Sequence, residues 1–338
     1  MTVTVSRPPA APRGLLPARV LGGLTSSAIG LGCLPLTGGY GQVAVDDAVA
    51  TIQAAIELGV TLIDTADFYG GGAVERIVGT AISGDRAAAT VVTRGGAVFS
   101  GSARPTRHNG SPEFLRAACE ASLRRLGTSY IDLYLLARPD PTVPIEESVG
   151  GLGELVDAGL VRHIGLSEVP ETILRRAAAE RPLAAVESEY SLWNSTVERQ
   201  ILPITQALGI GLLAHSPLGR GFLAGSLTGG TELAPADYRR RQPRFSAENL
   251  AAQAPLLAEI TELARGYDVQ PAQLALAWLL ARGDAIVPIP GTRDRAHLAQ
   301  NSAATRLTLS TATVDRLTGL WDSARSEKDT NHRGDQPS

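Results

Sequence analysis

Residues 60–94 read VTLIDTADFYGGGAVERIVGTAISGDRAAATVVTR and contain one complete strand–helix–strand unit. The apolar runs at 60–65 and 90–94 have the length and the β-branched content of buried strands. Between them, residues 72–83 repeat apolar side chains at helical spacing. Two strands joined by a helix in this way are expected to be parallel, because a parallel neighbour needs a long crossover connection.

The same alternation continues along the chain in both directions. Strands are predicted at 28–33, 60–65, 90–94, 130–136, 162–167, 184–188, 209–215 and 285–290. Helices are predicted at 45–58, 72–83, 112–126, 145–158, from 170 onward, and at 196–208, 247–266, 270–282 and 293–302. Eight such units over about 275 residues favour an eightfold barrel. The fold class predicted is therefore α/β, a single (β/α)8 TIM barrel with an N-terminal hairpin and extra C-terminal helices.

An open, doubly wound sheet is the alternative for alternating strands and helices. Such a sheet normally carries a G-x-G-x-x-G turn after its first strand. Here the first strand runs into GLGCLPLTGGYG at 30–41, in which the glycines have a different spacing. The closed barrel is therefore preferred.

One domain is expected, with the barrel spanning 15–324. The segment 1–14 is rich in Pro and Ala, and 325–338 is polar without periodicity, so both are predicted to be flexible. The chain has 44% hydrophobic and 19% charged residues, which are globular values.

Composition also limits the partners. A net charge of −3 provides no basic field for nucleic acid or an acidic membrane surface. The N-terminus lacks the pattern of a secretion signal, and no uninterrupted apolar run reaches the roughly 18 residues of a membrane span. Two cysteines, Cys33 and Cys119, form neither a disulfide framework nor a metal cluster. We expect a cytoplasmic protein with a small-molecule partner and no metal, and its oligomeric state stays open.

In a barrel of this kind the functional groups lie where the strands end. The side chains at or just after the predicted strand ends are Asp64, Tyr69, Arg94, Ala137, Ser167, Glu168, Glu187, His215, Ser216, Gly291, Thr292 and Arg293. A single polar residue there means little, but the ordered set is informative.

Five segments carry a resemblance to a known family. They are GVTLIDTADFYGGGAVERIVG, SPEFLRAACEASLRRLGTSYIDLYLL, VRHIGLSEV, HSPLGRGFLAG and PAQLALAWLLARGDAIVPIPGTR. In this order they resemble the aldo-keto reductase family, over residues 20–322. The resemblance implies a barrel that binds NADPH in extended form across its strand ends and passes hydride to or from a carbonyl. It also implies a catalytic tetrad of Asp, Tyr, Lys and His.

The tetrad carries over only in part. Asp64 matches the family aspartate and Tyr69 the proton-donating tyrosine. Arg94 stands where the resemblance places the lysine, and Ala137 stands where it places the histidine. We therefore expect Tyr69, Asp64 and Arg94 to be the catalytic residues.

The residues implied to bind NADPH or NADP+ are better retained. Thr292 and Arg293 match the segment for the adenosine 2′-phosphate and pyrophosphate, and a helix start with a guanidinium suits phosphate on physical grounds. Ser167 matches a contact to the nicotinamide amide, Glu187 stands where Gln is frequent, and His215 stands where an aromatic ring stacks on the nicotinamide. The remaining implied contacts are Ser216, Leu218, Gly219, Gly221, Gly291, His297, Gln300 and Asn301.

Arg94 and Ala137 invite a physical comparison with the family pattern. Arg94 keeps the positive charge that lowers the pKa of a tyrosine, and it can pair with Asp64 through two parallel hydrogen bonds. Because a guanidinium is larger than an ammonium, we expect it to fill part of the space that Ala137 vacates. Independent drift of the two positions is the alternative.

The absence of a histidine at 137 removes a donor aimed at the substrate oxygen, which can be worth roughly 10²–10³ in rate. Reduction of a specialised carbonyl, enone or imine by an NADPH-dependent oxidoreductase is the leading hypothesis. The alternatives are a repurposed non-redox barrel, such as a lyase, dehydratase, isomerase or cyclase, and a catalytically silent cofactor-binding protein. His108 lies in a loop that could reach the site, although a solvated position is preferred, and His163 begins a strand at the far end of the barrel.

Overall fold

The computed structural model describes residues 16–99, 107–228, 230–234 and 237–320. The flexibility predicted for 1–14 and 325–338 falls outside these residues. Eight parallel strands form one sheet in the order β12-β11-β10-β9-β8-β5-β4-β3. Their bounds are β3 Leu31–Gly32, β4 Leu62–Asp64, β5 Thr90–Gly95, β8 Ile131–Leu136, β9 Val161–Ser167, β10 Ala185–Glu189, β11 Gly211–His215 and β12 Ile286–Pro288.

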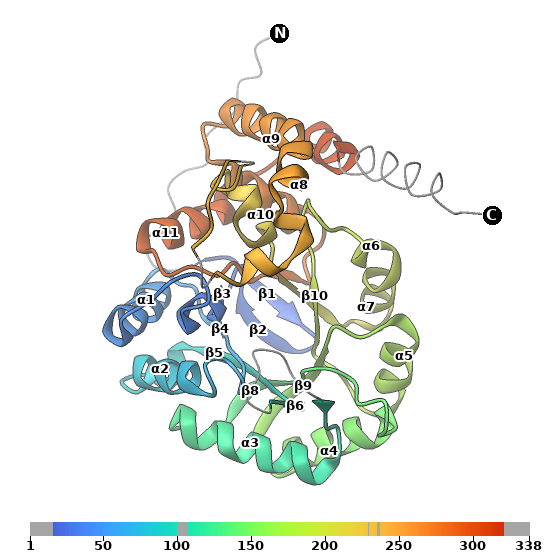
Figure 1. Ribbon diagram of the computed structural model, residues 1–338. Helices are drawn as coiled ribbons and strands as arrows, with labels where there is room; N and C mark the ends of the chain where they lie inside the picture. The colour runs from blue at the N-terminus through green and yellow to red at the C-terminus, as the bar shows by residue number, and fades with distance from the viewer. Residues whose placement is uncertain (1–15, 100–106, 229, 235–236, 321–338) are drawn as a thin grey trace, which may run out of the picture.

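The two edges of this sheet meet and close a barrel. Gly30 N donates to Pro288 O at 2.9 Å, and Gly32 N donates to Pro290 O at 3.2 Å. A parallel bridge also joins Gly32 to Gly291. The predicted (β/α)8 barrel is confirmed, and Figure 1 shows its strands surrounded by helices.

An N-terminal hairpin, as predicted, precedes the barrel. Strands β1 (Ala18–Leu21) and β2 (Leu24–Ser27) pair antiparallel. Leu21 and Leu24 are buried in one cluster with barrel residues such as Leu62, Val92 and Leu213. The hairpin therefore closes one end of the barrel with apolar side chains, and the opposite end is free to hold a site.

The helices cover the outside of the barrel. Those that follow strands in the first half are α1 Val45–Glu57, α2 Ala73–Ile82, α3 Pro112–Leu126, α4 Ile145–Asp157 and α5 Glu171–Glu180. Those in the second half are α6 Val197–Gln200, α7 Leu202–Leu208, α8 Ala247–Ala252, α9 Ala254–Gly266, α10 Pro271–Ala281 and α11 Arg295–Ala303, followed by helical residues 311–320. Among the described residues, no helix is both long and apolar enough to cross a membrane.

Two predicted helices are each divided in the structure. The helix expected at 196–208 breaks at Ile201 into α6 and α7, and the helix expected at 247–266 breaks at Gln253 into α8 and α9. In both cases a proline, Pro203 or Pro255, lies in the first turn of the second piece. Proline lacks the backbone N–H that a continuous helix needs, so it starts a new helix instead.

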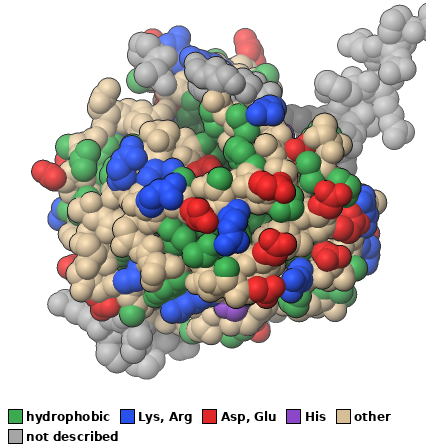
Figure 2. All heavy atoms as spheres, turned by 90° about the horizontal axis from the view of Figure 1, so that it is seen from below, with side chains coloured by type: hydrophobic (Ala, Val, Ile, Leu, Met, Phe, Trp, Pro, Cys, Tyr) green, Lys and Arg blue, Asp and Glu red, His purple; other side chains and the backbone are tan. Residues whose placement is uncertain are grey.

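The outer face of the helical layer carries charges of both signs. Figure 2 shows acidic and basic side chains interspersed over one face of the molecule. Exposed ion pairs of the helical layer include Arg176–Glu146 at 2.7 Å and Arg175–Glu171 at 3.0 Å. No large field of one sign dominates this face.

Two adjacent glycines of α4 provide a test of how tightly the helical layer is packed. A Cβ at Gly151 would lie 2.8 Å from the Cα of Pro112 at the start of α3, whereas a Cβ at Gly150 would meet nothing within 4 Å. Gly151→Ala should therefore lower the free energy of unfolding by about 1–3 kcal/mol, because α4 must move away from α3. Gly150→Ala should raise it by about 0.5–1 kcal/mol through helix propensity alone. Urea denaturation of the two variants measures both effects, and equal effects would contradict this packing.

Candidate active site

A cavity of about 910 Å³ opens at the carboxyl ends of the strands. Its wall includes Asp64, Tyr69 and Arg94 on one side, and Gly291, Thr292 and Arg293 on the other. The structure brings together nearly all the predicted site residues. The predicted residues that line it are Asp64, Tyr69, Arg94, Ser167, Glu187, His215, Ser216, Leu218, Gly221, Gly291, Thr292, Arg293, His297, Gln300 and Asn301. Gly219, the remaining one, lies in the loop between Leu218 and Gly221.

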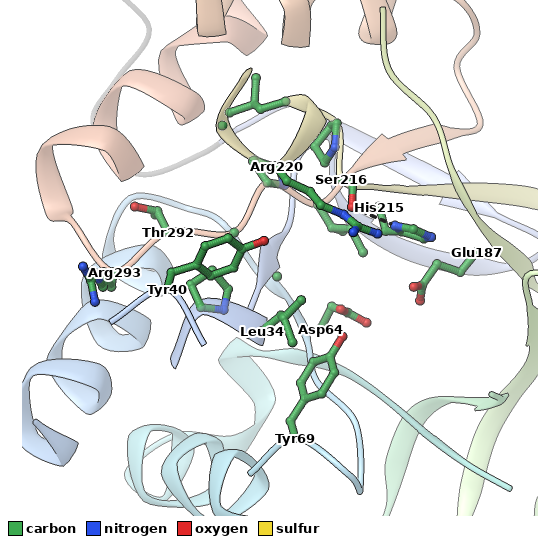
Figure 3. Close-up of a pocket in the computed structure, with 18 of the residues that line it drawn as sticks. Leu34, Tyr40, Asp64, Tyr69, Glu187, His215, Ser216, Arg220, Thr292 and Arg293 are labelled. Atoms are coloured by element: carbon green, nitrogen blue, oxygen red, sulfur yellow. Dashed lines mark hydrogen bonds between the residues drawn. The ribbon is translucent and has the colours of Figure 1, made fainter. Parts of the chain in front are cut away.

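The cavity is elongated and has two chemically different ends. In Figure 3, Thr292, Arg293 and Tyr40 lie together at one end, and Glu187, His215 and Ser216 lie towards the other. The hydroxyl of Tyr69 points into the cavity towards Asp64. A ligand with two distinct parts fits this shape better than a small compact one.

Arg94 is the most tightly held charge in the cavity. It is 4% exposed, and its guanidinium forms ion pairs with Asp64 through Nη2 and with Glu187 through Nη1. Its Nε donates to the carbonyl oxygen of Thr65 at 3.2 Å. The expectation of two parallel hydrogen bonds from Arg94 to Asp64 is therefore wrong, because Nη1 of the guanidinium binds the carboxylate of Glu187 instead.

The second carboxylate changes how the mouth of the barrel is organised. Glu187 belongs to β10, and in the sheet order β8 and β9 lie between β10 and the β5 strand of Arg94. The Arg94 side chain thus reaches across the barrel mouth past the ends of β8 and β9. Ala137 follows β8 directly and lines the same cavity. That the Arg94 guanidinium fills space beside Ala137 stays a prediction.

The charges around Arg94 set the protonation of its neighbours. Burial raises the pKa of Asp64 to about 7, since the nearby Glu187 adds to burial and together they outweigh Arg94. Burial also raises the pKa of Tyr69 above its usual range. Arg94 acts to lower the pKa of Tyr69, with its guanidinium carbon 6.0 Å from the ring centroid, but the two carboxylates oppose it. Tyr69 is therefore a protonated hydroxyl at neutral pH.

His215 and Ser216 form a hydrogen-bonded chain with Glu168. His215 Nε2 bonds to Glu168 Oε1, and Nδ1 lies 3.1 Å from Ser216 Oγ. Burial acts to raise the pKa of Glu168, but the bond from His215 and its charge lower that pKa to about 2. Because an ionised carboxylate only accepts, Nε2 carries a proton, and in the neutral ring Nδ1 accepts from the Ser216 hydroxyl. The imidazole is thus fixed in orientation at the strand end.

Backbone strain gathers around this chain. Glu168, Ser216 and Arg220 have positive φ values of 54°, 50° and 57°, in the left-handed region that non-glycine residues rarely adopt. Such conformations cost free energy, and they cluster at functional sites in proteins. All three residues follow strands β9 and β11 at the cavity end of the barrel.

The end of the cavity that is expected to bind phosphate differs from the sequence expectation in one respect. The start of α11 is capped by Asp294, whose carboxylate accepts from Ala296 N at 2.7 Å and His297 N at 3.1 Å. These amides are therefore not free for an anion. Arg293 donates from Nη1 to the carbonyl oxygens of Gly41 at 2.7 Å and Gln42 at 3.2 Å, and its guanidinium forms no ion pair within 4.0 Å among the residues that the structure describes.

Several cavity residues were not expected from the sequence. Tyr40 and Tyr238 join two loops through their hydroxyls, with ring centroids 4.9 Å apart. Arg239 lies over the Tyr40 ring at 4.8 Å, and Arg220 lies over the Tyr238 ring at 5.6 Å. Arg138 and His108 also line the cavity. The loop at 222–246 has no motif that would identify the contacts of Tyr238 and Arg239. The only signal in its sequence is the positive charge of its arginines.

Metal chemistry was not expected from the sequence. Within the described ranges, no group of three or more His, Cys, Asp or Glu side chains is arranged to hold a metal ion. Cys33 and Cys119 are free and buried.

The shared guanidinium predicts coupling between Arg94 and Glu187. Arg94→Lys keeps the charge but lacks a planar head that can contact both carboxylates, so Glu187 is left buried without its partner. Removing one member of a buried pair typically costs about 3–5 kcal/mol, and retention of the charge should reduce that loss to about 1–3 kcal/mol. Glu187→Gln in the same chain should restore part of it, with a coupling free energy of about 0.5–3 kcal/mol in urea denaturation.

A matched control uses Glu168, which contacts His215 instead of Arg94. Arg94→Lys and Glu168→Gln should add within about 0.5 kcal/mol. Additive behaviour of Arg94→Lys with Glu187→Gln as well would contradict the shared ion pair.

Comparison with known proteins places this site in a family. The chain matches the model of the aldo/keto reductase family over residues 28–322. It is 43% identical over 291 residues to a protein named probable aldo-keto reductase 1 from Glycine max, covering 85% of this chain and 83% of that protein.

Solved structures agree with the sequence match. A glycerol dehydrogenase from Gluconobacter oxydans aligns with a TM-score of 0.83 at 27% identity, covering 91% of this chain and 95% of the other. An aldo/keto reductase from Klebsiella pneumoniae in complex with NADP and acetate aligns with a TM-score of 0.70 at 28% identity, covering 92% and 96%. The chain, with its barrel and its site at the strand ends, belongs to the aldo/keto reductase family.

Proposed function

We propose that this protein binds NADPH and reduces a carbonyl, enone or imine of a specialised small molecule, using an altered catalytic tetrad of Asp64, Tyr69, Arg94 and Ala137. The observation that carries the proposal is the state of Tyr69. Its hydroxyl points into a family-type cavity, and burial keeps its pKa above the usual range. A hydroxyl that stays protonated is a proton donor, which reduction needs.

The same observation weighs against the non-redox alternatives. An isomerase or lyase that used Tyr69 as its base would need the phenolate at neutral pH. The environment of Tyr69 disfavours the phenolate, because burial raises the pKa of Tyr69 and the charges of Asp64 and Glu187 oppose the lowering by Arg94. Reduction is therefore the better use of this site.

The nicotinamide end of the cavity fits the proposed cofactor. Glu187 Oε2 is buried and has no hydrogen-bond partner among the described residues, although Oε1 is bound to Arg94. A carboxamide N–H is the kind of donor that would satisfy such an oxygen. Ser167, which is 2% exposed, and the oriented ring of His215 lie on the neighbouring strands β9 and β11.

The other end of the cavity fits a phosphate-bearing group. Arg293 presents a cation without a carboxylate partner in the described chain, and Thr292, Gln300 and Asn301 line the wall beside it. Ser216, Leu218 and Gly221 belong to a loop in which Arg220 and Gly221 adopt positive φ, a backbone form that can expose N–H groups to an anion. The capped start of α11 leaves the Arg293 guanidinium as the main proposed phosphate ligand.

In the proposed reaction each residue has one task. When bound, the nicotinamide supplies the hydride for the substrate carbon. Tyr69 gives a proton to the substrate oxygen, while Arg94 and its two carboxylates keep the floor of the site rigid. His215 holds one face of the ring pocket through its bonds to Glu168 and Ser216.

Cofactor selectivity tests the phosphate assignment. Arg293→Ala should weaken NADPH binding by about tenfold or more and leave NADH binding nearly unchanged, since only NADPH carries a phosphate for the guanidinium. Fluorescence titration with both cofactors measures the two dissociation constants. Arg295→Ala, at the neighbouring exposed arginine, is the matched control. An equal loss for NADPH and NADH would refute this role of Arg293.

Tyr69 tests the chemistry itself. Tyr69→Phe keeps the ring and removes only the proton donor, so the rate of NADPH oxidation with a reducible carbonyl should fall by about 10²–10⁴. NADPH affinity and the unfolding midpoint should stay close to those of the unmodified protein. Because the pKa of Tyr69 is raised, its deprotonation should not reduce the reaction rate between pH 7 and 9. A variant with full turnover would place the proton donor elsewhere in the cavity.

A further inference from the structure

A histidine from outside the strand ends lies in the same cavity as Ala137. His108 is the last residue of β7 (Arg107–His108), which pairs antiparallel with β6 (Ala97–Val98). Its loop sequence favours a solvated position for this side chain, whereas the structure places it in the cavity wall with Tyr69, Arg94 and Ala137. That preference is wrong, because the pairing of β7 with β6 brings residue 108 to the end of β5.

Strand pairing brings His108 to the position where the tetrad histidine is missing. His108 is paired with Ala97, and Ala97 follows the end of β5 by two residues. At that end, Gly95 is paired with Leu136, the residue before Ala137, and Ala137 N donates to Gly95 O at 2.8 Å. His108 thus lies beside the carboxyl ends of the two strands that carry Arg94 and Ala137.

Several contacts fix the hairpin in this position. Asn109 N donates to Gly96 O at 2.8 Å, and Gly110 N donates to Asp140 Oδ2 at 3.0 Å. On the other arm, Phe99 stacks on Phe68 with centroids 5.2 Å apart. Phe68 in turn makes an edge contact with Tyr69 at 5.1 Å. The hairpin is therefore packed directly against the loop that carries the catalytic tyrosine.

One ring nitrogen of His108 lacks a hydrogen-bond partner. Its Nδ1 is buried and has no hydrogen-bond partner in the described part of the chain. Buried polar atoms are nearly always paired in proteins, so an unpaired one at a cavity wall points to a partner supplied by the ligand. Asp140, 8% exposed, is close enough to interact electrostatically with the imidazole.

We propose that His108 donates a hydrogen bond from Nδ1 to the carbonyl oxygen of the substrate, the task that residue 137 cannot perform here. This inference rests on the proposed function. In the reduction, the carbonyl carbon gains a hydride from NADPH, the oxygen gains the proton of the Tyr69 hydroxyl, and His108 keeps its own proton. The substrate carbonyl then lies between Tyr69 and the β6–β7 hairpin.

The test compares three substitutions in the full-length protein, with the best carbonyl found by screening NADPH oxidation. His108→Ala should lower kcat by about 10²–10³, the range for loss of one donor to a developing oxyanion. His108→Asn should retain most of kcat, because its amide N–H lies near the place of Nδ1–H. His163→Ala is the matched control at the other end of the barrel and should match the unmodified protein. NADPH affinity, measured by fluorescence, should be unchanged in all three.

Rescue and chemical protection distinguish catalysis from structure. Ala137→His added to His108→Ala should raise kcat at least tenfold over His108→Ala alone. In the unmodified protein, a bound carbonyl ligand should protect His108, but not His163, from diethyl pyrocarbonate, as measured by mass spectrometry of the labelled peptides. This second measurement needs no turnover and serves even if His108→Ala fails to fold.

The outcomes separate this proposal from the one on which it rests. Turnover by His108→Ala equal to that of the unmodified protein, or no protection of His108 by the carbonyl ligand, overturns the role of His108 and leaves the proposed function intact. Failure of the unmodified protein to bind NADPH or to reduce any carbonyl, enone or imine overturns both.

Discussion

The ion pairs that hold Arg94 between Asp64 and Glu187 are the constraint on which the site depends. A guanidinium that is 4% exposed is costly to bury, and it is tolerated only where carboxylates and hydrogen bonds compensate for lost water. Asp64 and Glu187 belong to strands on opposite sides of β5, β8 and β9. One side chain therefore ties β4, β5 and β10 together at the mouth of the barrel.

This arrangement determines what the cation can do for catalysis. Burial of Asp64 raises its pKa to about 7, and the negative charge of Glu187 adds to this effect while Arg94 opposes it. Burial likewise raises the pKa of Tyr69 above its usual range, and Asp64 and Glu187 oppose the lowering by Arg94. The proposed proton donor, Tyr69, therefore stays protonated beside a buried cation that is held by two ion pairs.

The cavity combines rigid and strained parts. Its floor consists of strand ends joined by buried ion pairs, whereas its far wall consists of loops joined by the Tyr40–Tyr238 contact and by the Arg293 bonds to Gly41 and Gln42. The left-handed backbone at Glu168 and Ser216 lies between these parts and fixes the edge where His215 is held. Chemistry at one end and recognition at the other thus rest on different interactions.

The sequence by itself determined the barrel and the strand-end residues. The spacing of apolar residues, with the glycines and prolines between them, predicts the strands closely. The Ser111-Pro112 helix start predicts α3 at Pro112–Leu126, as the structure has it. Local signals suffice here because a strand end or a helix cap depends on neighbouring residues. The prolines that separate α6 from α7 and α8 from α9 are local signals of the same kind.

Only the tertiary structure decided which residues of the site touch. Glu187 as the second partner of Arg94, 93 positions away, and Tyr238 as the partner of Tyr40, 198 positions away, depend on barrel closure and on the course of long loops. The place of His108 depends on the pairing of β6 with β7, in which Ala97 is opposite His108. Each of these strands has two residues, which is too short to produce an alternating pattern in the sequence. Such contacts arise from the geometry of the closed barrel, and no local propensity records them.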